Sequence, residues 1–160
     1  MIKILQSPLG ELAVTVSAGK LVSIEFDPNK VCDEVLVSRE DSDVMSEVEK
    51  QLGEYFNRKR TTFNLPLYSQ GTVFQQSVWE QLSSIPFGET ISYQELASRI
   101  GKPAACRAVG QANRRNPIPI VVPCHRVIGK DRSLKGYAGS LTPLKEHLLI
   151  LESTQLDKAF

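Results

Sequence analysis

The stretch "SYQELASRIGKPAACRAVGQANRR", residues 92–115, predicts two short helices joined by a tight turn. Ser92 and Glu95 have the spacing of a capping box, which marks the start of the first helix. The letters "GKP" give a three- to four-residue turn, and the second helix is expected from Pro103 to Arg115. This pattern is typical of a helix-turn-helix, although many helical hairpins never touch DNA. It predicts a mostly helical, winged-helix-like C-terminal domain.

The second of these helices is unusually narrow. Five of its thirteen positions are alanine or glycine, and Arg107 stands nearly alone as a long side chain before Arg114 and Arg115. A helix that reads bases in the major groove normally presents several long polar side chains. A slim helix with one arginine suits the DNA backbone or the minor groove, and deformation of the duplex rather than base reading. Small residues also allow close helix packing, and the two interpretations are compatible.

Two further helices flank this pair. Thr72 and Gln75 form another capping box, followed by apolar residues at helical spacing as far as Ile85. Near the C-terminus, Thr142 followed by a proline predicts the start of a last helix, which is expected to run to about Glu152.

The N-terminal part has the opposite pattern. "MIKILQ", "ELAVTVS" and "LVSIEF" alternate apolar and polar residues between turn signals, which predicts an antiparallel β-meander. Apolar residues then recur at helical spacing from about Ser42 to Arg58, and "TTFNLPLYSQG", residues 61–71, is a candidate linker. We therefore expect an α+β fold with an N-terminal α+β domain, 1–66, and a C-terminal domain, 67–160.

Composition places the chain among globular proteins. It has 160 residues, 41% of them hydrophobic, and its apolar runs are far shorter than the ~20 residues of a membrane span. No signal peptide is recognisable, so we expect a cytoplasmic protein without membrane contact. The three cysteines are scattered and form no CxxC pair, which argues against a disulfide framework.

Charge is divided unevenly along the chain. Residues 1–80 hold 8 Lys and Arg against 12 Asp and Glu, whereas residues 81–160 hold 11 against 6. Between Arg99 and Lys145 one acid, Asp131, stands among ten basic residues. A solvated surface would explain this excess, but a clustered basic face more often binds a polyanion.

Chemistry is concentrated in "NPIPIVVPCHRVIG", residues 116–129. Three prolines exclude a regular helix there and can hold Cys124 rigidly. A cysteine attacks only as thiolate, and His125 is the histidine that lies near it in sequence. Taken alone, a cysteine after "IVVP" is more often buried filler. Spacings suited to a metal site are missing, so we expect no metal and no cofactor.

The segment from Val73 to Glu152 closely resembles the O6-alkylguanine-DNA alkyltransferases, also called methylated-DNA–protein-cysteine methyltransferases. The resemblance is carried by "SYQELA", "RAVGQAN", "NPIPIVVPCHRV" and "GYAG", in the order and spacing of that family. Residues 1–66 match only in pattern, and in the family this part has an RNase H-like fold. The resemblance implies repair of O6-alkylguanine, with O4-methylthymine as a further expected substrate, by one irreversible transfer to Cys124 of a monomeric protein.

The resemblance also implies residue roles. His125 would take the thiol proton through a water, Glu152 would orient His125, and Asn116 would hold the turn under the active-site strand. Tyr93 would donate to N3 of the departing guanine, while Arg107 would fill the gap left in double-stranded DNA by the flipped base, from the minor groove. Further DNA contacts are expected at Ser92, Ala105, Arg114 and Arg115, and the base pocket at Val127, Tyr137, Ala138 and Gly139.

Two alternatives stay open at this stage. A damage sensor or regulatory DNA-binding module would keep the fold without the chemistry, as do relatives whose reactive cysteine is replaced. A cysteine hydrolase would need a hydrolysable intermediate, which a thioether is not. Some family members hold zinc in the N-terminal part, but this chain has only Cys32 and no histidine there. Cys106 is either a small filler residue or an oxidation-sensitive thiol.

Overall fold

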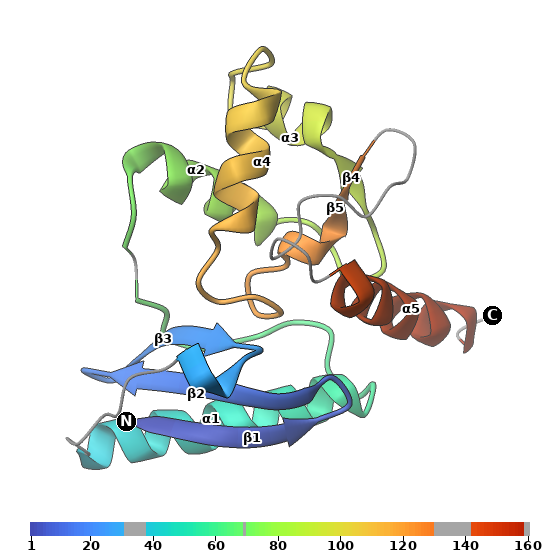
Figure 1. Ribbon diagram of the computed structural model, residues 1–160. Coiled ribbons are helices and arrows are strands. Elements are labelled where there is room, and N and C mark those ends of the chain that lie inside the picture. The colour runs from blue at the N-terminus through green and yellow to red at the C-terminus, as the bar shows by residue number, and fades with distance from the viewer. Residues whose placement is uncertain (31–37, 69, 130–141, 159–160) are drawn as a thin grey trace. The chain divides into compact units, whose positions relative to one another are not determined.

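The computed structural model describes residues 1–30, 38–68, 70–129 and 142–158. The chain divides into two compact units, Met1–Ser69 and Gln70–Phe160. Figure 1 shows a sheet with one long helix in the first unit and a helical second unit. Within the described ranges, none of the helices has the length and apolar character needed to cross a membrane. The expected α+β class is confirmed.

The first unit contains the predicted meander. Strands β1 (Ile2–Ser7), β2 (Gly10–Ser17) and β3 (Lys20–Glu25) pair antiparallel in the order β1-β2-β3. Ala18 and Gly19 join β2 to β3, both with positive φ (51° and 73°), as two-residue hairpin turns of type I′ require. A single-turn 3-10 helix, η1 (Pro28–Lys30), follows β3.

Helix α1 (Arg39–Phe56) covers one face of this sheet (Figure 1). It begins three residues before the predicted start because the Ser38 side chain caps it, accepting from the Asp41 N–H at 3.0 Å. The Asp41 carboxylate accepts in turn from the Gly19 N–H (2.8 Å), which ties the hairpin to the helix. Four of the residues predicted to face the core are buried: Met45, Val48, Leu52 and Tyr55.

Part of the predicted linker belongs to the sheet instead. The N–H of Leu21 donates to the Pro66 carbonyl (2.8 Å), and the N–H of Tyr68 donates to the Leu21 carbonyl (2.9 Å). This isolated parallel bridge adds a short segment to the sheet at the free edge of β3. Sequence reasoning missed it because pairing at a sheet edge depends on tertiary position and leaves no periodic signal in so short a segment.

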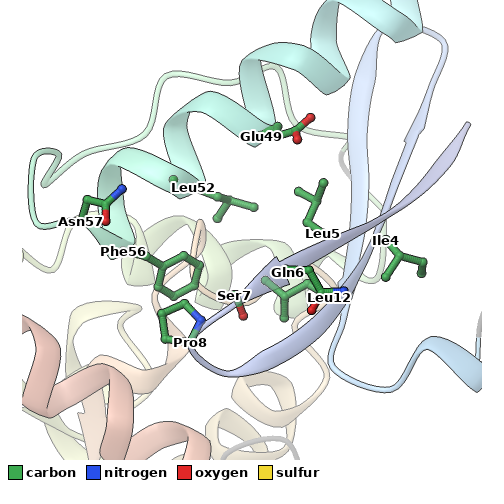
Figure 2. A pocket seen from close by; sticks show the side chains of 11 residues that line it. Ile4, Leu5, Gln6, Ser7, Pro8, Leu12, Glu49, Leu52, Phe56 and Asn57 are labelled. Carbon is green, nitrogen blue, oxygen red and sulfur yellow. The ribbon is translucent and has the colours of Figure 1, made fainter.

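A pocket of about 510 Å³ opens between β1 and α1 of the first unit (Figure 2). Its apolar wall includes Leu5, Leu12, Leu52 and Phe56. The lining contains no cysteine, histidine or lysine.

The second unit is built around three packed helices, α2 (Val73–Leu82), α3 (Tyr93–Arg99) and α4 (Cys106–Arg114). Two short parallel strands, β4 (Ile91–Ser92) and β5 (Val127–Ile128), pair beside them. The 3-10 helix η2 (Cys124–Arg126) leads directly into β5, and α5 (Thr142–Lys158) packs against η2. The predicted capping at Thr72 is complete, and Ser92 caps α3 by accepting from the Glu95 N–H.

Two helix boundaries differ from the sequence prediction. Helix α4 begins at Cys106 rather than Pro103, so residues 100–105 form a longer connection than the predicted turn. Proline disfavours helical geometry in the residue before it, and the Pro103 carbonyl accepts from the Gln94 side chain (2.8 Å) rather than from a following helical turn. Helix α5 continues beyond Glu152 to Lys158.

Replacing Thr72 with alanine tests the capping of α2. The variant loses the side-chain acceptor for the Gln75 N–H (3.0 Å), and we expect the second unit to lose about 1 kcal/mol of unfolding free energy. Trp79, the single tryptophan of the sequence, lies on α2 and reports urea unfolding by its fluorescence. Thr72→Ser keeps the acceptor and is the matched control. An alanine variant as stable as wild type would contradict the capping role.

Candidate active site around Cys124

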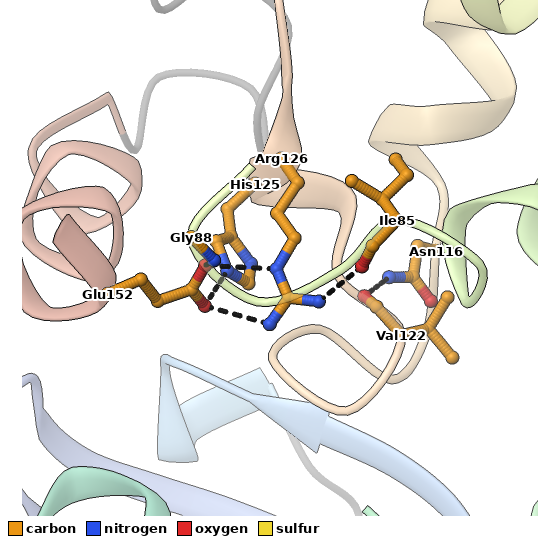
Figure 3. A network of polar contacts seen from close by, with 7 residues as sticks. All are labelled: Ile85, Gly88, Asn116, Val122, His125, Arg126 and Glu152. Atoms are coloured by element: carbon orange, nitrogen blue, oxygen red, sulfur yellow. Dashed lines mark hydrogen bonds and ion pairs between the residues drawn. The ribbon is translucent and has the colours of Figure 1, made fainter. Parts of the chain in front are cut away.

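Cys124 follows a tight turn and lies in the interior of the second unit, where the residue is 3% exposed. The Val122 N–H donates to the Ile118 carbonyl (2.9 Å), and Ile120 between them has a φ of 75°, a strained value for a β-branched residue. Asn116 braces this turn from both ends. Its amide donates to the Val122 carbonyl (2.8 Å; Figure 3) and accepts from the Ile118 N–H (3.0 Å).

The two residues after Cys124 converge on one carboxylate. His125 Nε2 lies 2.6 Å from Glu152 Oε2, and Arg126 donates to both oxygens of the same carboxylate at 2.9 and 3.1 Å (Figure 3). All three side chains are buried. Two positive or hydrogen-bonding partners from η2 thus clamp one acid from α5, in the bidentate geometry that suits arginine.

The contacts among His125, Arg126 and Glu152 determine the charge states of Glu152 and His125. Burial by itself raises the pKa of Glu152, but the hydrogen bonds and charges of His125 and Arg126 outweigh it and lower that pKa to about 2. Burial lowers the pKa of His125, and its contact with Glu152 only partly opposes this. At neutral pH the site therefore holds a carboxylate and a neutral imidazole. With Nε2–H donating to the carboxylate, Nδ1 is the basic nitrogen of the ring.

Arg126 also joins η2 to the segment between α2 and β4. Its Nη1 donates to the Ile85 carbonyl (2.6 Å; Figure 3), and its guanidinium lies 5.7 Å from the centre of the Phe87 ring. The Gly88 N–H approaches Glu152 Oε1 at 3.4 Å. The carboxylate of Glu152 therefore fixes three segments that are distant in sequence.

Tyr93 begins α3 and has a half-buried side chain. Burial, followed by the charge of Cys124, raises the pKa of its phenol to about 12, against a smaller opposite effect from a hydrogen bond with Asn113. Tyr93 therefore keeps its proton at neutral pH. The charge of Cys124 therefore acts on the phenol of Tyr93.

Sequence reasoning overlooked three side chains of this site. Arg126 clamps Glu152, Asn113 donates to the Cys124 carbonyl (3.3 Å), and Lys145 donates to the Val127 carbonyl (2.5 Å). A signal existed for Lys145, because it precedes Glu152 by seven residues, two helical turns, and so shares its helix face. The apolar residues between them make that face an inward one.

The structure describes some of the other predicted site residues but not all of them. Val127 is buried in β5, and Ala105 directly precedes α4. The three arginines of α4 and its C-terminus are exposed, which leaves them accessible to a ligand: Arg107, Arg114 and Arg115. The predicted pocket residues Tyr137, Ala138 and Gly139 lie outside the described residues, as does Cys32. Among the residues that the structure does describe, no three His, Cys, Asp or Glu side chains could hold a metal ion.

The arrangement has the parts of an activated nucleophile. A buried thiol is followed by a neutral imidazole, and a carboxylate fixes the tautomer and orientation of that imidazole. The charge of the same sulfur acts on the pKa of a protonated phenol, Tyr93, and on that of a buried ammonium, Lys145. Such a site can accept a group on sulfur while a proton is supplied to the leaving group.

Two family profiles match the chain: "6-O-methylguanine DNA methyltransferase, ribonuclease-like domain" over residues 2–68, and "6-O-methylguanine DNA methyltransferase, DNA binding domain" over residues 73–154. The constitutive methylated-DNA–protein-cysteine methyltransferase of Bacillus subtilis (strain 168) is 46% identical over 151 residues, 92% of each chain. That of Methanosarcina barkeri is 46% identical over 154 residues, 96% of this chain and 97% of its own. Mycobacterium tuberculosis OGT, solved in complex with DNA, superposes with a TM-score of 0.86 at 40% identity, covering 96% of this chain and 93% of that one.

Replacing Arg126 with methionine should destabilise the second unit strongly. The substitution leaves the buried charge of Glu152 without its bidentate partner, and we expect a loss of about 3–5 kcal/mol. Urea unfolding followed by Trp79 fluorescence measures it, with exposed Arg115→Met as the control that should change little.

The double variant Arg126→Met/Glu152→Gln removes both charges and should recover part of this loss. If the single and double variants are equally unstable, the clamp does not act through the Glu152 charge.

Proposed function

The chain belongs to the 6-O-methylguanine DNA methyltransferase family, and we propose that it repairs DNA by moving an alkyl group from O6 of guanine onto Cys124. The observation that carries the proposal is the buried Cys124, followed in η2 by a neutral His125 that Glu152 holds at 2.6 Å. The relatives at 46% identity are named for the same reaction, with a protein cysteine as acceptor. O4-methylthymine is the further substrate that we assign.

The proposed step is a displacement at the alkyl carbon. His125 takes the thiol proton through a water, the sulfur attacks, and the bond from carbon to O6 breaks with its electron pair left on guanine. Tyr93 then donates to N3 of the departing base, for which its retained proton suits it. The product thioether has no carbonyl that water could attack, so each protein molecule reacts once.

A base inside a duplex cannot reach a buried sulfur, so the proposal includes base flipping. Arg107 is exposed on the narrow helix α4, and we assign it to the gap left in the stack, approached from the minor groove. Arg114 and Arg115 are assigned to phosphates, and Ser92 and Ala105 to backbone contacts at the ends of α3 and α4. The relative from M. tuberculosis was solved in complex with DNA, which supports DNA as the partner of this chain.

We also assign the residues of the base pocket and the roles of the two domains. Val127, Tyr137, Ala138 and Gly139 are assigned to the base pocket, and Asn116 to holding the turn before Cys124. DNA binding and transfer are assigned to the C-terminal domain, 67–160, and the N-terminal domain is 1–66. Because chromosomal DNA is the substrate, we place the protein in the cytoplasm, acting as a monomer without cofactor.

The alternative function is a sensor of alkylated DNA that binds without transfer. It requires the DNA-binding surface but gives no reason for the Glu152–His125 pair behind a buried cysteine. A buried network of this kind is costly to assemble, and the transfer reaction explains its presence.

Intact-protein mass measures the proposed reaction directly. After incubation with a duplex that contains one O6-methylguanine, we expect a gain of one methylene per molecule, which saturates because the thioether is stable. Cys124→Ala should show no gain, whereas Cys106→Ala, which removes a less buried thiol, should react like wild type. Selective binding of the lesion without any mass gain would favour the sensor.

The role of Arg107 can be separated from the chemistry. Arg107→Ala should slow repair of a duplex by at least ~10-fold, since holding a base out of the stack costs a few kcal/mol. Reaction with the free base O6-benzylguanine needs no flipping and should change little. Arg39→Ala removes a charge from α1 that is also exposed, and it is the matched control. Equal losses on both substrates would remove Arg107 from the flipping step.

A further inference from the structure

Strand β1 lies at the edge of the three-stranded sheet, and among the described strands only β2 pairs with it. Met1 and Val16 exchange both of their backbone hydrogen bonds, each 2.8 Å long. Because bonded and non-bonded pairs alternate in an antiparallel ladder, the odd-numbered residues of β1 bond to β2. The backbone N–H and C=O groups of Ile4 and Gln6 therefore point away from the sheet, where they form a template for another strand.

The usual protection of a sheet edge is weak at β1. A lysine on an edge strand discourages pairing with other chains, but the single lysine of β1, Lys3, is bound to Glu49 of α1 at 2.7 Å. The next residue, Ile4, is apolar and 41% exposed. The pairing with β2 runs without a register shift from Ile2 to Ser7, so no bulge bends the edge out of line.

The pocket of the first unit runs beside this edge (Figure 2). One wall consists of consecutive residues 4–8, from β1 and the turn after it, and the other comes from the C-terminal part of α1. Its lining includes the buried apolar side chains of Leu5, Leu12 and Leu52. The pocket thus offers open backbone groups beside an apolar cavity. PDZ and PTB domains bind extended peptides by adding a strand to an edge of this kind, with pockets for alternate side chains.

Gly53 lines the same pocket from inside α1. Glycine weakens a helix relative to alanine, so its presence there needs a reason. Gly53 is not among the glycines with positive φ, and a Cβ at this position would meet no atom within 4 Å. Neither the backbone conformation nor packing within the first unit therefore requires glycine. An occupant of the open space beside Gly53 explains the residue.

Charge indicates what kind of occupant the pocket takes. Glu49 supplies the one charged side chain of the lining, and α1 as a whole carries six acidic residues against two basic ones. On the other face of the sheet, exposed Glu11 accepts from the Gln6 side chain at 3.2 Å. These carboxylates attract a cationic ligand and repel an anionic one, which includes DNA.

We propose that the outer edge of β1 and the adjoining pocket bind an extended, cationic peptide segment of a partner protein, which adds a strand antiparallel to β1. The peptide residues opposite Ile4 and Gln6 exchange backbone hydrogen bonds with them. The peptide residue opposite Leu5 points to the same side of the sheet as Leu5, toward α1, so its apolar side chain enters the pocket beside Gly53. The inference assigns a partner to the first unit and does not involve the chemistry at Cys124.

A synthetic peptide tests this binding on the full-length protein. The peptide acetyl-Thr-Lys-Val-Thr-Val-Lys-Thr-amide presents two valines on one face of a strand and two lysines on the other. Amide NMR of the protein labelled with nitrogen-15 should show saturable changes in β1 and in the C-terminal part of α1. Hydrogen exchange of the Ile4 and Gln6 amides should slow by ~10-fold or more, because both gain an acceptor.

Two altered peptides separate strand addition from simple apolar binding. N-methylation of the two lysines and the central threonine removes the donors that face β1, and it should weaken binding by ~10-fold or more. Replacing both lysines with glutamate should also weaken binding at low salt. That difference should shrink as salt is added, because salt screens charges at the surface.

Variants at Gly53 test the pocket itself. Gly53→Leu fills the open space and should weaken peptide binding by ~10-fold or more, since it excludes the valine anchor. Gly53→Ala adds only a methyl group and should bind within ~3-fold of wild type. Both variants favour the helix and should melt at or above the wild-type temperature by circular dichroism, which excludes unfolding as the cause. Both should still transfer a methyl group to Cys124 at the wild-type rate.

Four results would overturn the inference: no saturable binding of the lysine peptide, equal binding of the N-methylated peptide, equal binding of the glutamate peptide at low salt, or equal binding by Gly53→Leu. Sedimentation tests a different occupant. A wild-type dimer that Gly53→Leu converts to monomers would make a second copy of this chain the occupant and would also overturn the inference. A wild-type protein that binds the peptide but transfers no methyl group would contradict the proposed function alone.

Discussion

The carboxylate of Glu152 is the contact on which the second unit depends. It accepts from His125 and from Nε and Nη2 of Arg126, and it does so inside the protein, where an unpaired charge would be prohibitively costly. Helix α5 can therefore dock only in the register that brings Glu152 to these partners. The same register brings Lys145 to the Val127 carbonyl and Tyr93. One ionic contact thus determines the geometry of both ends of the site.

The ionised carboxylate of Glu152 contributes both to folding stability and to the reactive state of the site. Glu152 must stay ionised to hold Arg126, and an ionised Glu152 fixes His125 as the tautomer whose basic nitrogen is Nδ1. On acidification the unfolded chain binds protons that the folded chain resists, first at His125 below pH 6.5 and then at Glu152 below pH 4.5. Folding stability and the reactive protonation state should therefore be lost in the same direction of pH.

The sequence predicted those features that depend on local pattern. The three strands follow from alternation, and the starts of α2 and α3 follow from Thr72 and Ser92, whose side chains act within one turn. Cys124 and His125 were candidates because they are neighbours in the sequence, whereas their roles and the place of Glu152 came from a family resemblance. The structure then showed that His125 and Glu152 meet across 27 residues.

Features that depend on tertiary position were not predicted. A lysine such as Lys145 reads as a surface residue until the helix that carries it is docked, and the pairing of Tyr68 with Leu21 leaves no trace in local periodicity. The start of α4 at Cys106 depends on the Pro103 carbonyl, which accepts a hydrogen bond from the Gln94 side chain. Helix propensities of single residues do not describe such a contact. Arg126 stood in a quoted motif, yet its partner lies on another element.

The central claim is that Glu152 keeps His125 neutral with its Nε2 proton directed at the carboxylate. Nitrogen NMR of the labelled imidazole measures this directly, and His147→Gln removes the signal of the other histidine in the sequence. The account predicts a neutral His125 ring protonated at Nε2 at pH 7, whose first change on acidification comes below pH 6.5. An imidazolium at pH 7, or a neutral ring protonated at Nδ1, would contradict it.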